Sequence, residues 1–280
     1  MKLASYSVGG RASFGVAVGD GIIDGTRCLG GRFSSLRQVL AADALDEVRR
    51  TTTGQASDHK LSDVTFLPVV PDPQRIVCVG INYRSHAEET GRDISPAPSV
   101  FLRLTDTLVG HGGALVRPKV SDKFDFEGEL AVVIGRAGRH VAEADALKYV
   151  AGYTCFVDGS VRDYQKFSVT SGKNFPGTGP LGPVLVTADE IPDPTRLTLV
   201  TRLNGQEVQR SGTDMLIYSI PQIIKFMSDF TSLAPGDVIA TGTPAGVGHR
   251  RSPPLWMKAG DVLEVEISGI GILRNPVVDE

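Results

Sequence analysis

The segment 121–135, SDKFDFEGELAVVIG, decides how this sequence is interpreted. Four carboxylates crowd its first half, and an uninterrupted apolar run follows, which predicts a buried strand. In an extended chain the side chains alternate, so Glu127 and Glu129 project to one face, while Gly128 faces the other side and permits close backbone approach. Two neighbouring carboxylates repel each other, and a divalent cation between them would remove that conflict.

The rest of the chain is rich in strand signals. From residue 76 onward, short β-branched runs such as RIVCVG, GYTCFVDG and DVLEVEISG alternate with Gly, Pro and Asn-Gly turns. Convincing helical patterns occur only at 34–50, at 143–150 and at 219–230, where Ser219 is a candidate cap. Strands are too frequent for an alternating βαβ chain, so we predict an α+β protein built mainly of mixed sheets.

Three prolines in LPVVPDPQR (67–75) indicate a connector between two units. We therefore expect a small N-terminal α+β domain at 1–70 and a larger catalytic domain at 71–280.

Composition excludes several classes of protein. The 280 residues carry a formal net charge of −3 and no basic block, so no electrostatic footprint for nucleic acid or an anionic membrane is present. No apolar run is long enough to span a bilayer, and the N-terminus lacks a signal-peptide pattern. Three cysteines without CxxC spacing indicate neither a disulfide framework nor a thiolate zinc site. We expect a cytoplasmic protein whose partners are small molecules or a second copy of the chain.

A third carboxylate would complete a metal site, and Asp158 in CFVDG stands at the end of a predicted strand. Carboxylate oxygens suit Mg²⁺ or Mn²⁺, and no histidine lies near enough in sequence to indicate zinc. From the pattern alone, Glu127 and Glu129 fit metal ligands and a solvated strand start equally well.

A candidate base lies in VGINYRSHAEETG (79–91), which starts as a strand and enters a short polar helix. His86 and Glu89 are three residues apart and share a helix face, so the carboxylate can orient the imidazole for proton removal from water. The alternative is a surface histidine with a nearby glutamate. The following segment 90–106 is rich in loop formers and is a candidate lid.

Two Gly-rich loops, SGKNFPGTGPLGP (171–183) and ATGTPAGVG (240–248), lack the spacing of a phosphate-binding loop. Lys173 in the first loop, together with Arg162 and Gln165, would supply donors for an enolate or a tetrahedral oxyanion beside a metal. A lone loop lysine is otherwise usually solvated.

Taken together, these segments resemble the fumarylacetoacetate hydrolase family, in its shorter bacterial form related to acylpyruvate hydrolases and oxaloacetate decarboxylases. The resemblance runs from about residue 75 to the C-terminus through GINYRSHAEE, DFEGELAVVIG, VDGSVRDYQ, GKNFPGTGPLGP, LNGQEVQ, LAPGDVIATGTPAGVG and GIGILRNPV, in that order. It implies a mixed β-sandwich roll that forms homodimers, preceded here by the small N-terminal domain. Many relatives carry Asp after the Lys-x-Phe of the lysine loop, whereas this chain has Pro176.

The resemblance also implies roles for individual residues. Glu127, Glu129 and Asp158 would hold Mg²⁺ or Mn²⁺, or Ca²⁺ in a crystal. His86 and Glu89 would form the water-activating dyad, with Lys173 and Gln165 as further catalytic groups. Substrate contacts are expected from Arg162, Tyr83, Lys123 and Thr243. The variable part of the pocket is expected to involve Phe101, Tyr164, Phe175 and Trp256.

The leading hypothesis is metal-dependent hydrolysis of a carbon–carbon bond in a β-diketone acid of the acylpyruvate or fumarylpyruvate type, through an enolate. The alternative within enzymes is a decarboxylase of oxaloacetate, or an isomerase or hydratase of 2-oxo acids. The alternative from another class is a non-catalytic homologue that binds a metal-chelated ligand.

Overall fold

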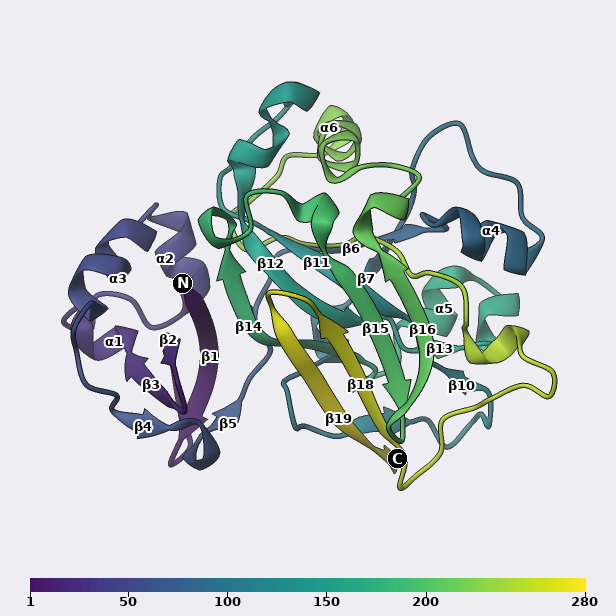
Figure 1. The fold of residues 1–280 in the computed structure, drawn as a ribbon, viewed down its shortest axis with the longest axis horizontal. Helices are drawn as coiled ribbons and strands as arrows, with labels where there is room; N and C mark the ends of the chain where they lie inside the picture. The colour runs from purple at the N-terminus through teal and green to yellow at the C-terminus, as the bar shows by residue number, and fades with distance from the viewer.

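The computed structural model describes residues 1–280 and contains two packed sheets and a short third one (Figure 1). Most neighbouring strands are antiparallel, but β17–β6, β8–β14 and β9–β19 are parallel, so the predicted mixed sheets are confirmed. The large sheet runs in the order β4 (His59–Lys60), β3 (Gly21–Asp24), β2 (Arg11–Val18), β1 (Lys2–Val8), β14 (Gly179–Thr187), β12 (Val150–Val157), β11 (Gly128–Ile134), β17 (Val238–Ala240), β6 (Ile76–Gly80) and β7 (Ser99–Arg103), with β5 (Thr65–Phe66) on β1 and β8 (Leu108–Val109) on β14.

The second sheet packs against one face of the large sheet, and the main core lies between them. Its order is β16 (Gln206–Gly212), β15 (Thr198–Leu203), β18 (Val262–Ile267), β19 (Gly271–Asp279) and β9 (Leu115–Arg117). The expected close approach at Gly128 occurs here, because a Cβ on Gly128 would lie 2.1 Å from Thr201 Oγ1 on β15. A strand-rich α+β fold with face-to-face sheets is therefore confirmed.

The N-terminal residues form one end of the molecule, at the left of Figure 1. Strand β1 pairs with β14 through Lys2 opposite Val186 and Leu3 opposite Leu185, so the large sheet continues across residue 70. Three short helices lie at this end, α1 (Gly25–Cys28), α2 (Leu36–Ala41) and α3 (Leu45–Thr52).

The single helix predicted at 34–50 is wrong, because the chain breaks between α2 and α3. Ser35 caps α2 as a side-chain acceptor, but Asp43 takes a left-handed φ of 51° and the Ala44 amide bonds back to Val39. Asp tolerates this conformation better than most residues, since its short polar side chain can bond locally. The break allows both halves to bury apolar residues in a second core on the outer face of the large sheet.

The helix predicted at 219–230 is confirmed as α6 (Ile220–Phe230), and Ser219 and Gln222 form a capping box at its start. The predicted helix at 143–150 is a 3-10 helix, η3 (Glu143–Tyr149), rather than an α-helix. Its N-cap residue, Ala142, offers no side-chain acceptor, and such a short segment favours the tighter turn. No helix of the structure is both long and apolar enough to traverse a membrane.

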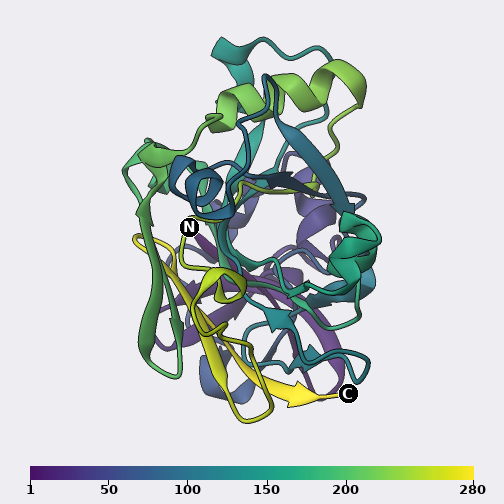
Figure 2. The ribbon, with the colours of Figure 1, turned by 90° about the vertical axis from the view of Figure 1, so that its right-hand side faces the viewer.

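The opposite end of the molecule, at the right of Figure 1, carries α4 (Arg84–Thr90), α5 (Val169–Lys173) and the small sheet of β10 (Phe124–Asp125) and β13 (Ser160–Val161). Figure 2 views the molecule from this side. The candidate lid at 90–106 is only partly a loop, because Ser99–Arg103 forms β7 and pairs with β6. The β-branched and aromatic residues of β7 favour a strand there, although prolines precede it.

Candidate active site

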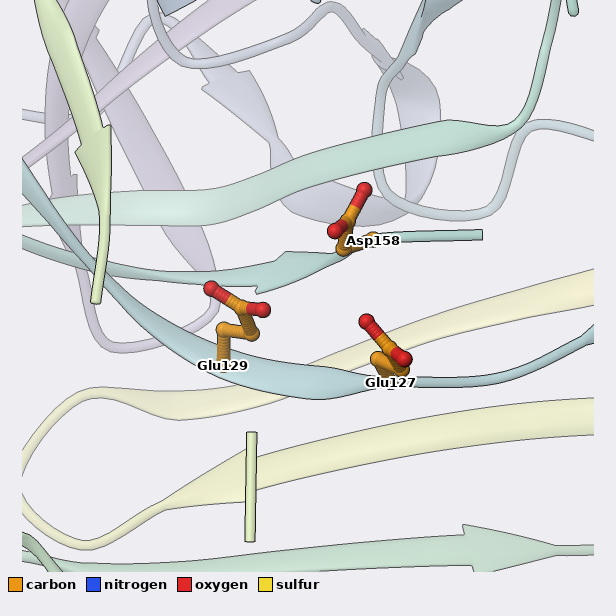
Figure 3. Close-up of side chains that lie close together, drawn as sticks. All are labelled: Glu127, Glu129 and Asp158. Carbon is orange, nitrogen blue, oxygen red and sulfur yellow. The ribbon is translucent and has the colours of Figure 1, made fainter. Parts of the chain in front are cut away.

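Three carboxylates meet where β11 and β12 leave the large sheet. Gly128 on β11 faces Val157 on β12, and the Asp158 amide donates to the Glu127 carbonyl at 2.9 Å. Strand alternation places Glu129 on the same side as Glu127, two residues along. One oxygen from each of the three side chains lies within 4.8 Å of the others, and all three residues are buried. Figure 3 shows the three carboxylates turned toward one another.

Three cations surround this acidic trio: Lys173 and Arg103 are buried, and Arg162 is mostly buried. Lys173 Nζ lies 2.6 Å from Glu127 Oε2 and 2.5 Å from Asp158 Oδ2. Arg103 Nη1 donates to the other Asp158 oxygen at 2.5 Å, and Arg162 Nη2 donates to Glu127 Oε1 at 2.7 Å. Each cation is therefore fixed in direction by a carboxylate, and Glu129 alone contacts none of them.

Glu129 is the most weakly neutralised member. Burial raises its pKa well above the ordinary range, and the charges of Asp158 and Glu127 raise it further, although the Gly242 amide donates to Glu129 Oε2 at 2.8 Å. For Glu127, burial also opposes ionisation, but Lys173 and Arg162 hold its pKa well below the ordinary range. Glu129 is therefore the member of the trio whose ionised form the surrounding cations compensate least.

The residues fit a hard divalent cation. All three donors are carboxylate oxygens, which Mg²⁺ and Mn²⁺ prefer. The cluster also includes Asp125, which accepts from Arg162, so four carboxylates face the three cations Arg103, Arg162 and Lys173. One negative charge remains when all of these groups are ionised. A divalent cation would reverse that sign and favour an anionic substrate.

His86 and Glu89 form the expected pair on α4. His86 Nδ1 and Glu89 Oε2 are 3.1 Å apart, and the Gly246 amide donates to the other carboxylate oxygen at 2.9 Å. An ionised Glu89 accepts from Nδ1–H, which leaves His86 Nε2 free to accept a proton. His86 lines the cavity described next, whereas Glu89 lies behind it.

A cavity of about 510 Å³ connects the trio with the histidine. Its wall contains most of the residues predicted from the sequence: His86, Phe101, Glu127, Glu129, Asp158, Arg162, Gln165, Lys173 and Thr243. The geometry therefore brings metal-ligand candidates, a candidate base and hydrogen-bond donors to one cavity, as an active site requires.

Other predicted residues lie elsewhere. Tyr83 is fully buried at the start of α4 and its hydroxyl contacts no polar atom, while Lys123 is exposed outside the cavity. Tyr164 and Phe175 pack edge to face at 5.1 Å and, like Trp256, do not line the cavity. Pro176 is compatible with the lysine loop, since Lys173 still reaches both carboxylates.

Several supporting residues were not predicted from the sequence. Gln209 accepts from the Gly128 amide at 3.0 Å and donates to Thr243 Oγ1 at 2.8 Å, and that hydroxyl donates to the Gly128 carbonyl at 2.9 Å. Asn82 bonds to the backbone of Tyr218 and Thr241. Gln209 and Asn82 both stand in quoted segments, but only the fold reveals their partners. Arg103, at the end of β7, had no sequence signal.

Comparison with known proteins identifies relatives along the whole chain. The family model described as fumarylacetoacetate (FAA) hydrolase C-terminal matches residues 75–278. The oxaloacetate tautomerase Fahd2a, mitochondrial, of Rattus norvegicus is 40% identical over 238 residues, which cover 84% of this chain and 76% of that protein.

Two solved structures extend the match to the N-terminal residues. The fumarylacetoacetate hydrolase from the psychrophile Exiguobacterium antarcticum is 34% identical, with a TM-score of 0.85 over 100% of both chains. The maleylpyruvate hydrolase from Sphingobium sp. SYK-6, in complex with manganese(II) ion and pyruvate, is 29% identical, with a TM-score of 0.85 over 100% of this chain and 99% of that one.

Proposed function

Because the chain belongs to the fumarylacetoacetate hydrolase family, whose members found here are hydrolases, isomerases or tautomerases, we propose that it is a divalent-metal-dependent hydrolase. Its substrate would be a β-diketone acid of the acylpyruvate or fumarylpyruvate type, cleaved at a carbon–carbon bond. One observation carries the proposal: the buried carboxylate trio shares a cavity with a histidine already oriented by a carboxylate.

Glu127, Glu129 and Asp158 would hold the cation. When bound, Mg²⁺ or Mn²⁺ supplies Lewis-acid polarisation of a 2-oxo carboxylate and offsets the charge that develops on it. Support comes from the maleylpyruvate hydrolase structure, which holds manganese(II) and pyruvate, and from the all-oxygen donor set of this chain.

The side chains would perform the proton transfers. His86 Nε2 removes a proton from water as its oxygen attacks the distal carbonyl, and Glu89 stabilises the imidazolium that results. Lys173 and Gln165 donate hydrogen bonds to the tetrahedral oxyanion. When this collapses, the carbon–carbon bond breaks, its electron pair passes to the pyruvate enolate, and a carboxylic acid leaves. The proton held on His86 Nε2 is then transferred to the enolate carbon.

A second candidate is the tautomerisation of oxaloacetate, supported by the 40% identity to the rat oxaloacetate tautomerase. There His86 would move a proton between the C3 carbon and the enol oxygen, with no attacking water. Decarboxylation of oxaloacetate uses the same carboxylate trio. In that reaction the base is less important, because no water needs activation.

The experiment follows loss of the acetylpyruvate enol in the ultraviolet, after chelation and after Mg²⁺ or Mn²⁺ is added back. Oxaloacetate is run in parallel, with keto–enol exchange and pyruvate release measured separately. Metal-dependent acetylpyruvate loss that is absent in Glu127→Gln, but retained in the exposed control Glu207→Gln, is the expected result. Exchange of oxaloacetate alone would replace the hydrolase with the tautomerase, and pyruvate release alone would indicate the decarboxylase. Inactivity on both compounds with metal bound would contradict both candidates.

A further inference from the structure

Asp125 is a fully buried carboxylate beside the site that neither lines the cavity nor belongs to the acidic trio. Both of its oxygens are saturated. Oδ1 accepts from the amides of Phe126 and Gly248, each at 2.8 Å. Oδ2 accepts from Arg162 Nε at 2.7 Å and from the His249 amide at 3.0 Å. Four donors on one buried carboxylate make its orientation very well determined.

The contacts of Asp125 fix the orientation of the Arg162 guanidinium. Asp125 Oδ2 lies 2.7 Å from both Nε and Nη2 of Arg162. Nη2 also donates to Glu127 Oε1 at 2.7 Å, and Nη1 donates to Gln165 Oε1 at 3.0 Å. The planar guanidinium leaves little freedom once three of its nitrogens are engaged. Arg162 therefore lines the cavity in one orientation, although it lies in a turn between β13 and the short 3-10 helix Tyr164–Lys166.

Asp125 also holds the loop that supports the base. The Gly248 and His249 amides that bind it lie two and three residues after Gly246, whose own amide holds Glu89. A single carboxylate thus connects the arginine on one side of the cavity with the loop behind the dyad on the other.

We propose that Asp125 is a positioning residue, which acts on substrate by holding Arg162 in the orientation that binds the 2-oxo acid. The inference rests on the proposed function in one respect, that Arg162 contacts the substrate. Asp125 itself touches no reacting atom. Its effect is transmitted by its hydrogen bond to Arg162 Nε and by the electrostatic attraction between its carboxylate and the guanidinium.

Asparagine at this position is an informative probe because it keeps the shape of the side chain but replaces one acceptor oxygen, which receives two hydrogen bonds, with a donor NH₂ group. Its amide oxygen can still accept from Phe126 and Gly248, but its NH₂ group then faces Arg162 Nε–H and the His249 amide, donor against donor. Asp125→Asn should therefore release Arg162 while leaving the trio intact.

The matched control is Asp237→Asn. Asp237 is an equally buried carboxylate that pairs with an arginine, Arg75 Nη1 at 3.0 Å, and accepts from the Ala234 amide at 2.8 Å. It lies at the far end of β11, where its carbonyl accepts from the Ile134 amide, and does not line the cavity. It reports the cost of damaging a buried Asp–Arg pair without touching Arg162.

The test measures pyruvate binding to the Mn²⁺-loaded protein by calorimetry in wild type, Asp125→Asn, Arg162→Gln and the double variant, with a crystal structure of Asp125→Asn. We expect both single variants to weaken binding by about 10-fold or more, as loss of a charged hydrogen bond does. The double variant should be little weaker than Arg162→Gln, and Asp237→Asn should bind like wild type. In the crystal structure, Arg162 Nη2 should have left Glu127.

Additive losses in the double variant would overturn the inference, because Asp125 would then act independently of Arg162. An unmoved Arg162 in the crystal structure would overturn it as well. Should Asp125→Asn fail to fold, Arg162→Lys replaces it: lysine keeps the charge but lacks the Nε–H, so it must bind pyruvate as poorly as Arg162→Gln. Wild-type affinity in Arg162→Lys would refute the inference. Neither readout depends on turnover, so failure of the proposed hydrolase reaction would be seen separately.

Discussion

Replacing Glu129 by glutamine (Glu129→Gln) tests whether the acidic trio binds a divalent cation through the group whose charge is least compensated. Burial and the charges of Asp158 and Glu127 raise the pKa of Glu129 in the metal-free protein. A folded-state pKa above the unfolded value stabilises the fold at low pH, and this contribution is lost as the pH rises through the folded-state pKa. A bound cation reverses that dependence, because it must displace the proton and then favours the ionised carboxylate.

The magnitude follows from linkage. A ligand at about 100 times its Kd stabilises the folded state by about 2.7 kcal/mol. For a chain of 280 residues that unfolds with an entropy of about 2.1 cal/mol/K per residue, this raises Tm by about 4 to 5 °C. The increase in Tm on cation binding should be larger at about pH 8 than at about pH 5.5, since a smaller fraction of Glu129 carries a proton that the cation must displace.

The assay is thermal unfolding of wild type, Glu129→Gln and the exposed control Glu207→Gln, with chelator or Mn²⁺, at both pH values. Glu129→Gln should be at least as stable as wild type without metal at the higher pH, because it removes an unfavourable buried charge, and should lose most of the Mn²⁺-dependent increase. The same increase in Glu129→Gln as in wild type, or an increase that falls with rising pH, would refute the assignment of Glu129 as a ligand.

Two further changes test the groups around the trio. Lys173→Ala removes the cation between Glu127 and Asp158 and should lower kcat by about 100-fold or more, as loss of an oxyanion donor does; steady-state kinetics beside the exposed control Lys225→Ala decide this, and near-normal turnover would remove Lys173 from the mechanism. Gly246→Ala should lower kcat by about 10-fold or more, because the new Cβ would lie 2.2 Å from the Val208 carbonyl and displace the amide that holds Glu89. The control Gly260→Ala has a similar positive φ of 89° but open space around it, so equal effects of the two alanines would show that backbone strain, rather than loss of the Glu89 contact, is responsible.

Much of the site could be predicted because its pieces are local in sequence. The alternation of Glu127, Gly128 and Glu129 follows from strand geometry, and the spacing of His86 and Glu89 follows from helix geometry. Asp158 is different, since it meets Glu127 only because β11 and β12 pair in one register. A shift of one residue would turn the glutamates to the opposite face. The sequence pattern alone does not specify that register.

The wrong and missed predictions also depend on contacts between residues that are distant in the sequence. The helix predicted at 34–50 shows helical spacing throughout, and the break at Asp43 depends on how each half packs against the sheet. From the sequence, Asp125 looks like one more acidic residue in the segment, because three of its four donors come from Arg162 and from a loop more than 120 residues later in the chain. The expected homodimer and cytoplasmic location depend on surfaces and surroundings outside a single chain, and both stay predictions.

The Gly-rich segment 242–249 explains why such distant residues act together. Its backbone amides hold Glu129 through Gly242, Glu89 through Gly246 and Asp125 through Gly248 and His249. In the proposed reaction, the three carboxylates would serve different parts: one would bind the cation, one would orient the base and one would fix Arg162. Because the donors are main-chain groups of one short loop, movement of the loop would disturb all three together. Substitutions that shift this backbone should therefore reduce substrate binding and turnover in parallel. Truncation of a single carboxylate should instead reduce either binding or turnover more strongly than the other.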